Sequence, residues 1–104
     1  MIDIKIIQQL CKDDKLHWTS HVAKRMIRRM ISPEEVIDVL LHGTIIEQYP
    51  NDYPVPSCLI LGLTVNGRIL HVVCSVMYDA VSIITAYQPD PNEWDMTFSK
   101  RREK

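Results

Sequence analysis

The sequence predicts a single α+β domain, in which N-terminal helices pack on one face of a four-stranded, mainly antiparallel sheet. Apolar residues recur at helical spacing only before Gly43, whereas β-branched residues and turn signals dominate from Thr44 onward. With 104 residues, 46% of them apolar, the chain can build one core but not two. We expect one domain over residues 1–99 and a charged, unstructured tail over residues 100–104.

Three helices are expected before the sheet. Isoleucine and leucine residues recur at helical spacing between positions 2 and 10 and predict a helix over residues 3–13. A second helix is expected to begin with Ser20 as its cap. The third follows Ser32-Pro33-Glu34-Glu35, which combines a cap residue, a proline at the first helical position and a glutamate at the third. Gly43 is expected to end this helix.

Four strands are expected after Gly43. Their residues are β-branched or aromatic, and they are separated by a proline-rich loop over residues 50–56 and by turn residues. The expected strands are residues 44–49, 57–65, 68–77 and 81–88. Pro89-Asp90-Pro91 should stop the last strand, and Trp94 is expected to pack against the sheet.

The turns between these strands predict which side chains share a face. If Asn66-Gly67 is a two-residue loop, His71 lies opposite Gly62, which would leave room for an approaching group. The helices should then cover a face made of Leu59, Leu61, Leu63, Leu70, Val72, Cys74 and Val76. If residues 78–80 form a three-residue turn, Tyr87 lies opposite His71 with Thr85 on the same face. A two-residue turn would direct Thr85 and Tyr87 to the other face.

Charge is segregated along the chain although the formal net charge is only −1. This net charge excludes a general attraction to nucleic acid, so any such contact must come from a local patch. Residues 15–31 carry cations and no acid, and acidic residues follow directly from Glu34. The three cysteines form no Cys-x-x-Cys pair and predict reduced core residues. Without a signal sequence, a spanning apolar run or a cluster of metal ligands, we expect a cytoplasmic protein with no membrane contact, no metal and no cofactor.

The second expected helix has a cationic side. At 100° per residue, His21, Arg25, Arg28 and Arg29 lie within one arc of about 100°. Apolar residues fill the opposite arc, so this helix can dock on a core and expose its cations. The positive end of a helix also favours an anion beside a neutral histidine. The simpler interpretation is a solvated basic face without a ligand.

Together with the hairpin histidine, this helix contains the groups needed to cleave RNA without a metal. The ribose 2′-OH needs a base, the leaving 5′-oxygen needs an acid, and the phosphorane needs cations. His21, His71, Arg25, Arg29 and Tyr87 include all of these groups. Each also has an ordinary explanation, since a strand histidine is commonly a half-buried, hydrogen-bonded residue, and threonine and tyrosine favour strands.

Four ordered motifs resemble one known family. They are His21-x-x-x-Arg25-Met26-x-x-Arg29-x-Ile31-Ser32, Gly43-x-Ile45-Ile46-Glu47-x-Tyr49-Pro50, Leu70-His71-Val72-Val73 and Ile84-Thr85-Ala86-Tyr87-x-Pro89-Asp90-x-x-x-Trp94. Over about residues 17–94 the chain resembles the domain-of-unknown-function family DUF4258. The resemblance implies a fold similar to the barnase and RelE-like (BECR) metal-independent ribonucleases, and a toxin paired with an antitoxin that is sometimes zinc-binding. It implies site positions His21, Arg25, Arg29, His71, Thr85 and Tyr87. Met30 stands where the family usually has glycine.

The leading hypothesis is a metal-independent endoribonuclease of the toxin type. In it, His71 and His21 share the acid and base roles. Arg25 and Arg29, with Arg28 beside them, hold the scissile phosphate, while Tyr87 and Thr85 orient it. The alternative is a non-catalytic module that binds RNA or an acidic protein through the basic helix. A third interpretation is a homo-oligomer in which this helix pairs with the acidic helix that begins at Glu34.

Overall fold

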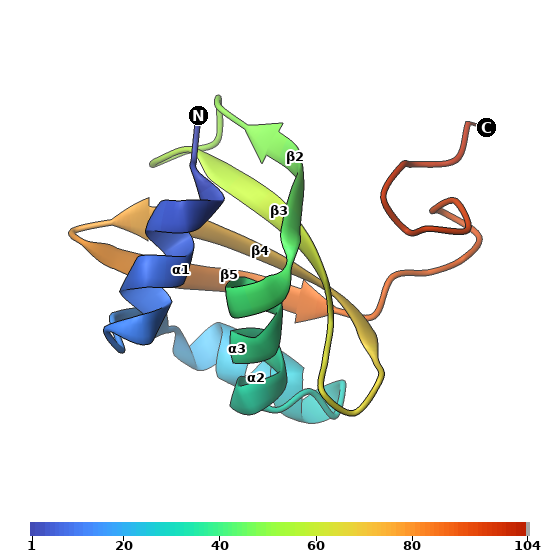
Figure 1. Cartoon of the computed structure of the whole chain (residues 1–104), viewed down its shortest axis with the longest axis horizontal. Coiled ribbons are helices and arrows are strands. Elements are labelled where there is room, and N and C mark those ends of the chain that lie inside the picture. Colours follow the sequence, from blue (N-terminus) through green and yellow to red (C-terminus); the bar gives the residue numbers. More distant parts are fainter. Residues whose placement is uncertain (104) are drawn as a thin grey trace.

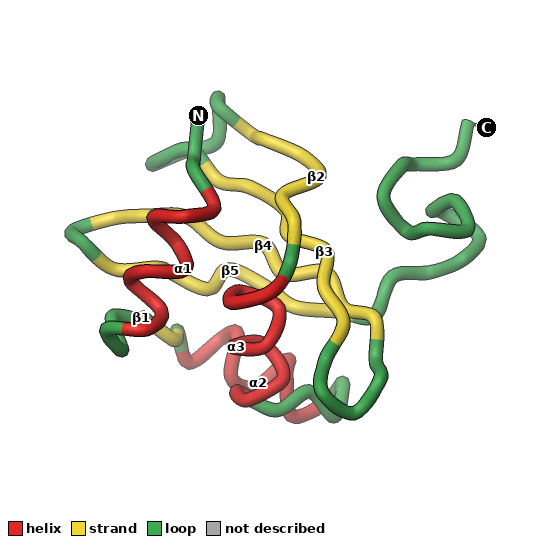
Figure 2. Tube along the Cα trace, viewed as in Figure 1, coloured by secondary structure: helices red, strands yellow, loops and turns green. Residues whose placement is uncertain are grey.

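The chain folds into an α+β structure in which three helices lie on one side of a mixed sheet. The computed structural model describes residues 1–103. Figures 1 and 2 show the helices gathered on one side and the C-terminal residues on the other. The elements in chain order are α1 (Ile4–Lys12), β1 (Leu16–Trp18), α2 (Ser20–Arg28), α3 (Pro33–His42), β2 (Thr44–Tyr49), β3 (Ser57–Leu63), β4 (Ile69–Met77) and β5 (Ala80–Tyr87).

The sheet has five strands, in the order β1-β5-β4-β3-β2. Strands β2 to β5 form an antiparallel meander, and β1 pairs in parallel with β5. The prediction of a four-stranded sheet is therefore wrong by one strand. Strand β1 has only three residues, too few for an alternating pattern, and its first residue, Leu16, pairs with Val81 of β5.

The helix ends follow local capping chemistry. Asp3 caps α1, and Ser32 and Glu35 form the expected capping box at the start of α3. The cap of α2 is Thr19 rather than Ser20, because the Thr19 side chain accepts the hydrogen bond from the backbone N–H of Val22 at 3.0 Å.

Helix α2 ends in a Schellman motif that explains the position of Met30. The N–H of Ile31 donates to the carbonyl of Met26 at 2.9 Å, and the N–H of Met30 donates to that of Ile27 at 3.1 Å. Met30 has a φ of 57°, in the left-handed region where glycine is favoured. The motif makes Arg29 the C-cap of α2, beside β5.

The register of the β3–β4 hairpin differs from the expected one. Leu61, not Gly62, lies opposite His71, because residues 65–67 form a three-residue loop in which Gly67 has a φ of 85°. The helix-facing residues of β3 are therefore Cys58 and Ile60 rather than the odd-numbered leucines. The buried core on this side consists of Ile7, Cys11, Val22, Met26, Ile31, Val36, Val39, Leu40, Cys58, Ile60, Leu70, Val72, Cys74, Val81, Ile83 and Ala86.

Two glycines allow α3 to approach the sheet closely. A Cβ atom on Gly62 would lie 3.0 Å from the Cα atom of Val39, so the space over this glycine belongs to α3 and not to a ligand. A Cβ atom on Gly43 would lie 2.5 Å from the carbonyl oxygen of Val39. Gly43 has an extended φ of −83°, so it ends α3 through this lack of space and not through a left-handed cap.

The β4–β5 turn has two residues, yet the expected facing of β5 is retained. Tyr78 and Asp79 both have positive φ values, and Met77 pairs with Ala80 instead of Val81. A bulge then inserts one extra residue into β5, between the pairs Cys74–Ile83 and Val73–Thr85. As a result, Tyr87 lies opposite His71, as predicted.

The segment after β5 covers the sheet face that the helices leave open. Trp94 is buried there and forms an isolated β-bridge with Arg101. Leu59 and His71 are buried on the same face. The expectation that Trp94 packs on the sheet is confirmed, but residues 101 and 102 make hydrogen bonds and are not an unstructured tail. Position 104 lies outside the described residues.

Candidate functional site

His71 lies at the centre of the face covered by the C-terminal segment. Its side chain is fully buried, and the Trp94 ring packs edge-on against it with 4.5 Å between ring centroids. Its Nε2 atom lies 2.8 Å from the backbone oxygen of Phe98, and its Nδ1 atom lies 3.2 Å from the Tyr87 hydroxyl oxygen. Both ring nitrogens therefore have protein partners.

These partners define the protonation state of His71. A carbonyl oxygen only accepts, so Nε2 carries the proton and donates it to Phe98, and Nδ1 of the neutral ring accepts from Tyr87. Burial lowers the pKa of His71; the Phe98 carbonyl and the Glu47 carboxylate oppose this shift, and Arg101 adds to it. The ring is therefore neutral at pH 7.

Arg29 connects helix α2 to this histidine through β5. Its guanidinium donates to the Thr85 hydroxyl at 3.1 Å and to the backbone oxygen of Ala86 at 2.8 Å. Tyr87 is the next residue, and it lies on the same face as Thr85. Burial raises the pKa of Tyr87, so its hydroxyl keeps its proton. Four of the predicted site residues thus form one contiguous group, which consists of Arg29, Thr85, Tyr87 and His71.

The other three predicted residues lie on the exposed side of α2. His21, Arg25 and Arg28 are solvent-exposed, and within residues 1–103 none of their side chains hydrogen-bonds to the four-residue group. His21, Arg25 and Arg29 are spaced four residues apart and form a row along one side of the helix. At 1.5 Å per residue, His21 lies about 12 Å from Arg29 along the helix axis. The structure therefore places the two predicted catalytic histidines apart.

A network that the sequence did not predict adjoins His71. The Arg101 guanidinium donates to both Glu47 carboxylate oxygens at 3.1 Å and lies 4.7 Å from the centre of the Trp94 ring. The Tyr49 hydroxyl donates to Glu47. Burial alone would raise the pKa of Glu47, but the bonds from Arg101 and Tyr49 outweigh burial and lower it. The signal in the sequence was weak, because Glu47 and Arg101 are 54 residues apart.

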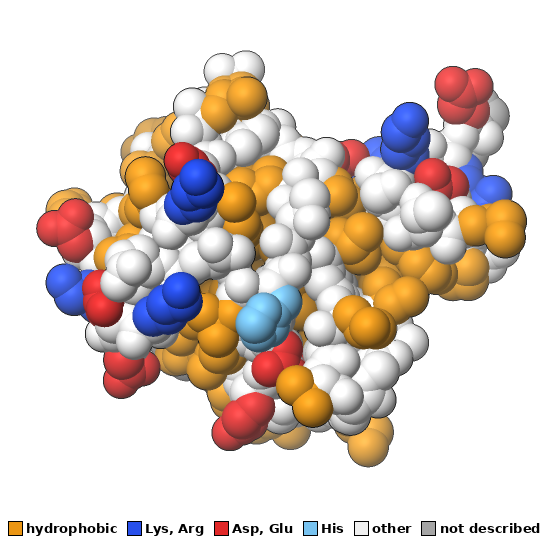
Figure 3. Space-filling view, viewed as in Figure 1, with side chains coloured by type: hydrophobic (Ala, Val, Ile, Leu, Met, Phe, Trp, Pro, Cys, Tyr) orange, Lys and Arg blue, Asp and Glu red, His pale blue; other side chains and the backbone are white. Residues whose placement is uncertain are grey.

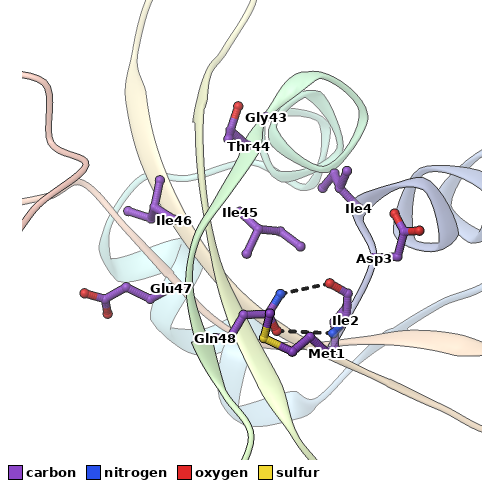
Figure 4. Close-up of a pocket in the computed structure, with 10 residues that line it drawn as sticks. All are labelled: Met1, Ile2, Asp3, Ile4, Gly43, Thr44, Ile45, Ile46, Glu47 and Gln48. Carbon is purple, nitrogen blue, oxygen red and sulfur yellow. Dashed lines mark hydrogen bonds between the residues drawn. The ribbon is translucent and has the colours of Figure 1, made fainter.

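A cavity of about 610 Å³ lies away from this group, between the N-terminal residues and β2 (Figure 4). Its lining includes none of the predicted site residues. Figure 4 shows Gln48 holding the backbone of Ile2 by two hydrogen bonds, while the side chain of Glu47 extends to the other side of β2. This cavity is therefore separated from the His71 group by strand β2.

The side of the molecule drawn in Figure 3 carries no large patch of a single charge. On the side shown in Figure 3, basic and acidic side chains are interspersed. Among residues 1–103, no three histidine, cysteine or acidic side chains gather as metal ligands would. No helix in this range is long and apolar enough to cross a membrane.

One of the comparisons with known proteins identifies a family. The family model described as "Domain of unknown function (DUF4258)" matches residues 18–88, which is more than half of the chain. The chain belongs to the DUF4258 family. No curated protein and no solved structure matches it. The matched range contains α2 and all strands from β2 to β5 but ends before Trp94, so the segment that covers His71 lies outside the DUF4258 match.

The buried histidine of this DUF4258 chain predicts a pH-dependent stability. Its pKa is lowered in the folded chain and returns to about 6.5 on unfolding, so below that pH the unfolded chain binds more protons. The free energy of unfolding should therefore fall as the pH drops from about 7.5 to about 5, a range in which carboxylates stay charged. Urea unfolding across this range measures the effect.

Two variants test whether His71 causes this pH dependence of stability. His71→Asn should flatten the dependence, because the titrating ring is gone. His21→Asn is the matched control, since His21 is exposed, and it should keep the slope of the native chain. Equal slopes in all three proteins would contradict the burial of a neutral His71.

Proposed function

We propose that this chain is a metal-independent endoribonuclease of the toxin type, with an antitoxin protein as its cellular partner. The observation that carries the proposal is the contact of Arg29 with Thr85, next to a tyrosine whose hydroxyl bonds a neutral histidine. This contact brings Arg29, a cation able to bind phosphate, close to Tyr87 and His71, which can exchange a proton. The helix-then-sheet order also agrees with the barnase and RelE-like fold that the family resemblance implies.

The row formed by His21, Arg25 and Arg29 on α2 supplies the binding surface for RNA. Arg29, Arg25 and His21 follow one another at one-turn intervals, so an extended strand can place successive phosphates along them. Arginine forks hold phosphate oxygens in two parallel hydrogen bonds. In this arrangement Arg29 holds the scissile phosphate. His21 lies too far along the helix to reach that phosphate and binds a neighbouring one instead.

Tyr87 and His71 supply the proton route. The 2′-OH gives its proton to the Tyr87 oxygen as the 2′-oxygen attacks phosphorus, and Tyr87 passes its own proton to Nδ1 of His71. The Phe98 carbonyl accepts from Nε2 throughout and holds the ring in the required tautomer. The bond from phosphorus to the 5′-oxygen breaks, and this oxygen takes a proton from water. The hydroxide that remains takes up the proton that Nδ1 of His71 returns through Tyr87, so the ring ends neutral. The products are a 2′,3′-cyclic phosphate and a 5′-hydroxyl end.

Purified protein is expected to cleave labelled single-stranded RNA in the presence of EDTA, because no step uses a metal. Gel analysis and treatment of the ends with phosphatase and kinase would identify the cyclic phosphate and the free 5′-hydroxyl. Arg29→Gln should reduce both binding and cleavage. Lys5→Gln on α1, where the lysine is also exposed, is the matched control and should change neither.

The second candidate is RNA binding without cleavage, and the burial of His71 favours it. The ring is fully buried, and Trp94 lies against it. Salt-sensitive RNA binding through α2, with the RNA left intact under all conditions, would establish this function and refute the ribonuclease.

A further inference from the structure

A second surface of α2 is apolar and exposed. A groove of about 320 Å³ runs between α2 and the start of α3, and its lining is entirely apolar. The lining residues are Trp18, Ala23, Met26, Ile27, Ile31 and Pro33. Ile27 leaves 77% of its surface exposed, and the nearby Met30 leaves 82% exposed. Exposed apolar surface gathered along a groove is typical of a site where another molecule docks.

This groove is distinct from the proposed RNA surface. At 100° per residue, Ile27 and Arg29 point about 160° apart around α2. Arg29 reaches β5, whereas Ile27 faces the start of α3. One helix therefore separates the two surfaces, and each can be altered without the other.

The charge around the groove selects the occupant. Lys24 lies one turn from both Ile27 and Arg28 on α2, and the two cations are exposed. Within the described residues neither cation forms an ion pair, and Glu34, next to Pro33, is the exposed acid that follows the groove in the sequence. An occupant with apolar side chains for the groove and carboxylates for these two cations would satisfy both features. The lining side chains carry no charge, and their one N–H donor is the indole of Trp18, which disfavours RNA as the occupant.

We propose that this groove binds an acidic amphipathic helix of a partner protein. Its apolar side, with anchors at positions i, i+3 or i+4 and i+7, packs against Trp18, Ile27 and Ile31. Its aspartate or glutamate side chains pair with Lys24 and Arg28. Trp18 forms part of the groove wall, and tryptophan is among the residues that contribute most to such interfaces. The inference does not depend on ribonuclease activity.

A stapled helical peptide with this pattern, labelled with fluorescein, tests the proposal by fluorescence anisotropy. Leucines occupy the anchor positions and glutamates flank them. The native chain should bind it with salt-dependent affinity, and a peptide with lysine in place of each glutamate should bind at least about tenfold more weakly. Failure of the acidic peptide to bind, or equal binding of both peptides, would overturn the proposal.

Matched variants locate the binding. Ile27→Ser should weaken binding at least about tenfold, and Lys24→Glu with Arg28→Glu should do the same and remove the salt dependence. Ile6→Ser on α1, where the isoleucine is 52% exposed, is the control and should leave affinity unchanged. Ile27 is exposed, so its replacement should keep the fold, as circular dichroism would verify. Binding that survives Ile27→Ser would overturn the proposal.

Two further outcomes would assign the groove to another occupant and overturn the proposal. One is a dimer, seen by sedimentation of the native chain, that dissociates in Ile27→Ser. The other is RNA that displaces the peptide and loses its own binding in Ile27→Ser. In contrast, RNA cleavage that is unchanged in Ile27→Ser, together with loss of peptide binding, would support both surfaces independently.

Discussion

Tyr87→Phe is expected to reduce RNA cleavage by about 10²- to 10⁴-fold, the usual contribution of a positioned proton-transfer group. The substitution removes only the hydroxyl, which lies 3.2 Å from Nδ1 of His71, and keeps the ring that packs on the sheet. RNA binding should stay within about twofold, because binding rests on the charge of α2. Single-turnover cleavage of a labelled RNA in EDTA measures the first quantity, and anisotropy measures the second.

The control for this variant is Tyr78→Phe. Tyr78 lies in the β4–β5 turn and is 94% exposed, so loss of its hydroxyl should change neither rate nor stability. Tyr87→Phe also leaves Nδ1 of a buried histidine without its partner, which costs about 1–3 kcal/mol of stability, so both proteins should be compared well below their unfolding temperatures. Cleavage by Tyr87→Phe at the native rate would exclude the proton route. An equal loss of binding and cleavage would instead give the Tyr87 hydroxyl a role in binding RNA.

The local signals in the sequence predicted most of the fold. The capping box at Ser32 and the change to β-branched residues after Gly43 correctly placed α3 and the four strands of the meander. These signals depend on neighbours within four residues, so the local sequence is sufficient to locate these elements. Strand β1 has no such signal, because its three residues form a strand only through their pairing with β5.

Register was harder to predict, since a single residue in a loop moves a whole strand. The β3–β4 loop is one residue longer than expected, and this reversed the predicted faces of β3. The β4–β5 turn is one residue shorter than expected, but a bulge restored the predicted pairing of His71 with Tyr87. That pairing was therefore predicted correctly for a reason that proved incomplete.

The candidate site was predictable where it follows element faces and not where it follows long-range contacts. The sequence grouped the α2 residues His21, Arg25, Arg28 and Arg29 with Thr85, Tyr87 and His71 of the sheet. In the structure hydrogen bonds join Arg29 to Thr85 and Tyr87 to His71, whereas the side chains of the other three lie exposed on α2. The cover over His71 comes from a segment with no periodic pattern. Its contacts, from Phe98 and Trp94, depend on how that segment lies on the finished sheet.

Trp94→Ala is expected to lower the free energy of unfolding by about 3–5 kcal/mol, as is typical for the loss of a buried aromatic ring. Trp94 is 2% exposed and lies between the His71 ring and the Arg101 guanidinium. Its removal should also let water reach His71. Because burial is the main cause of the lowered pKa of His71, that pKa should then rise toward about 6.5. Urea unfolding measures the stability, and an NMR titration of the imidazole carbon-bound protons measures the pKa.

The free energy of unfolding and the pKa of His71 together show whether the segment after β5 is packed on the sheet or only loosely attached. Met96→Ala is the matched control, because Met96 belongs to the same segment but is 89% exposed, and it should change stability by less than about 0.5 kcal/mol. If Trp94→Ala changed stability as little as this control and left the pKa of His71 in place, the segment would not bury the histidine in solution. If both quantities shift as expected, the C-terminal segment is part of the folded core. A substrate can then exchange a proton with His71 only through Tyr87, or it can contact His71 directly only after this segment moves.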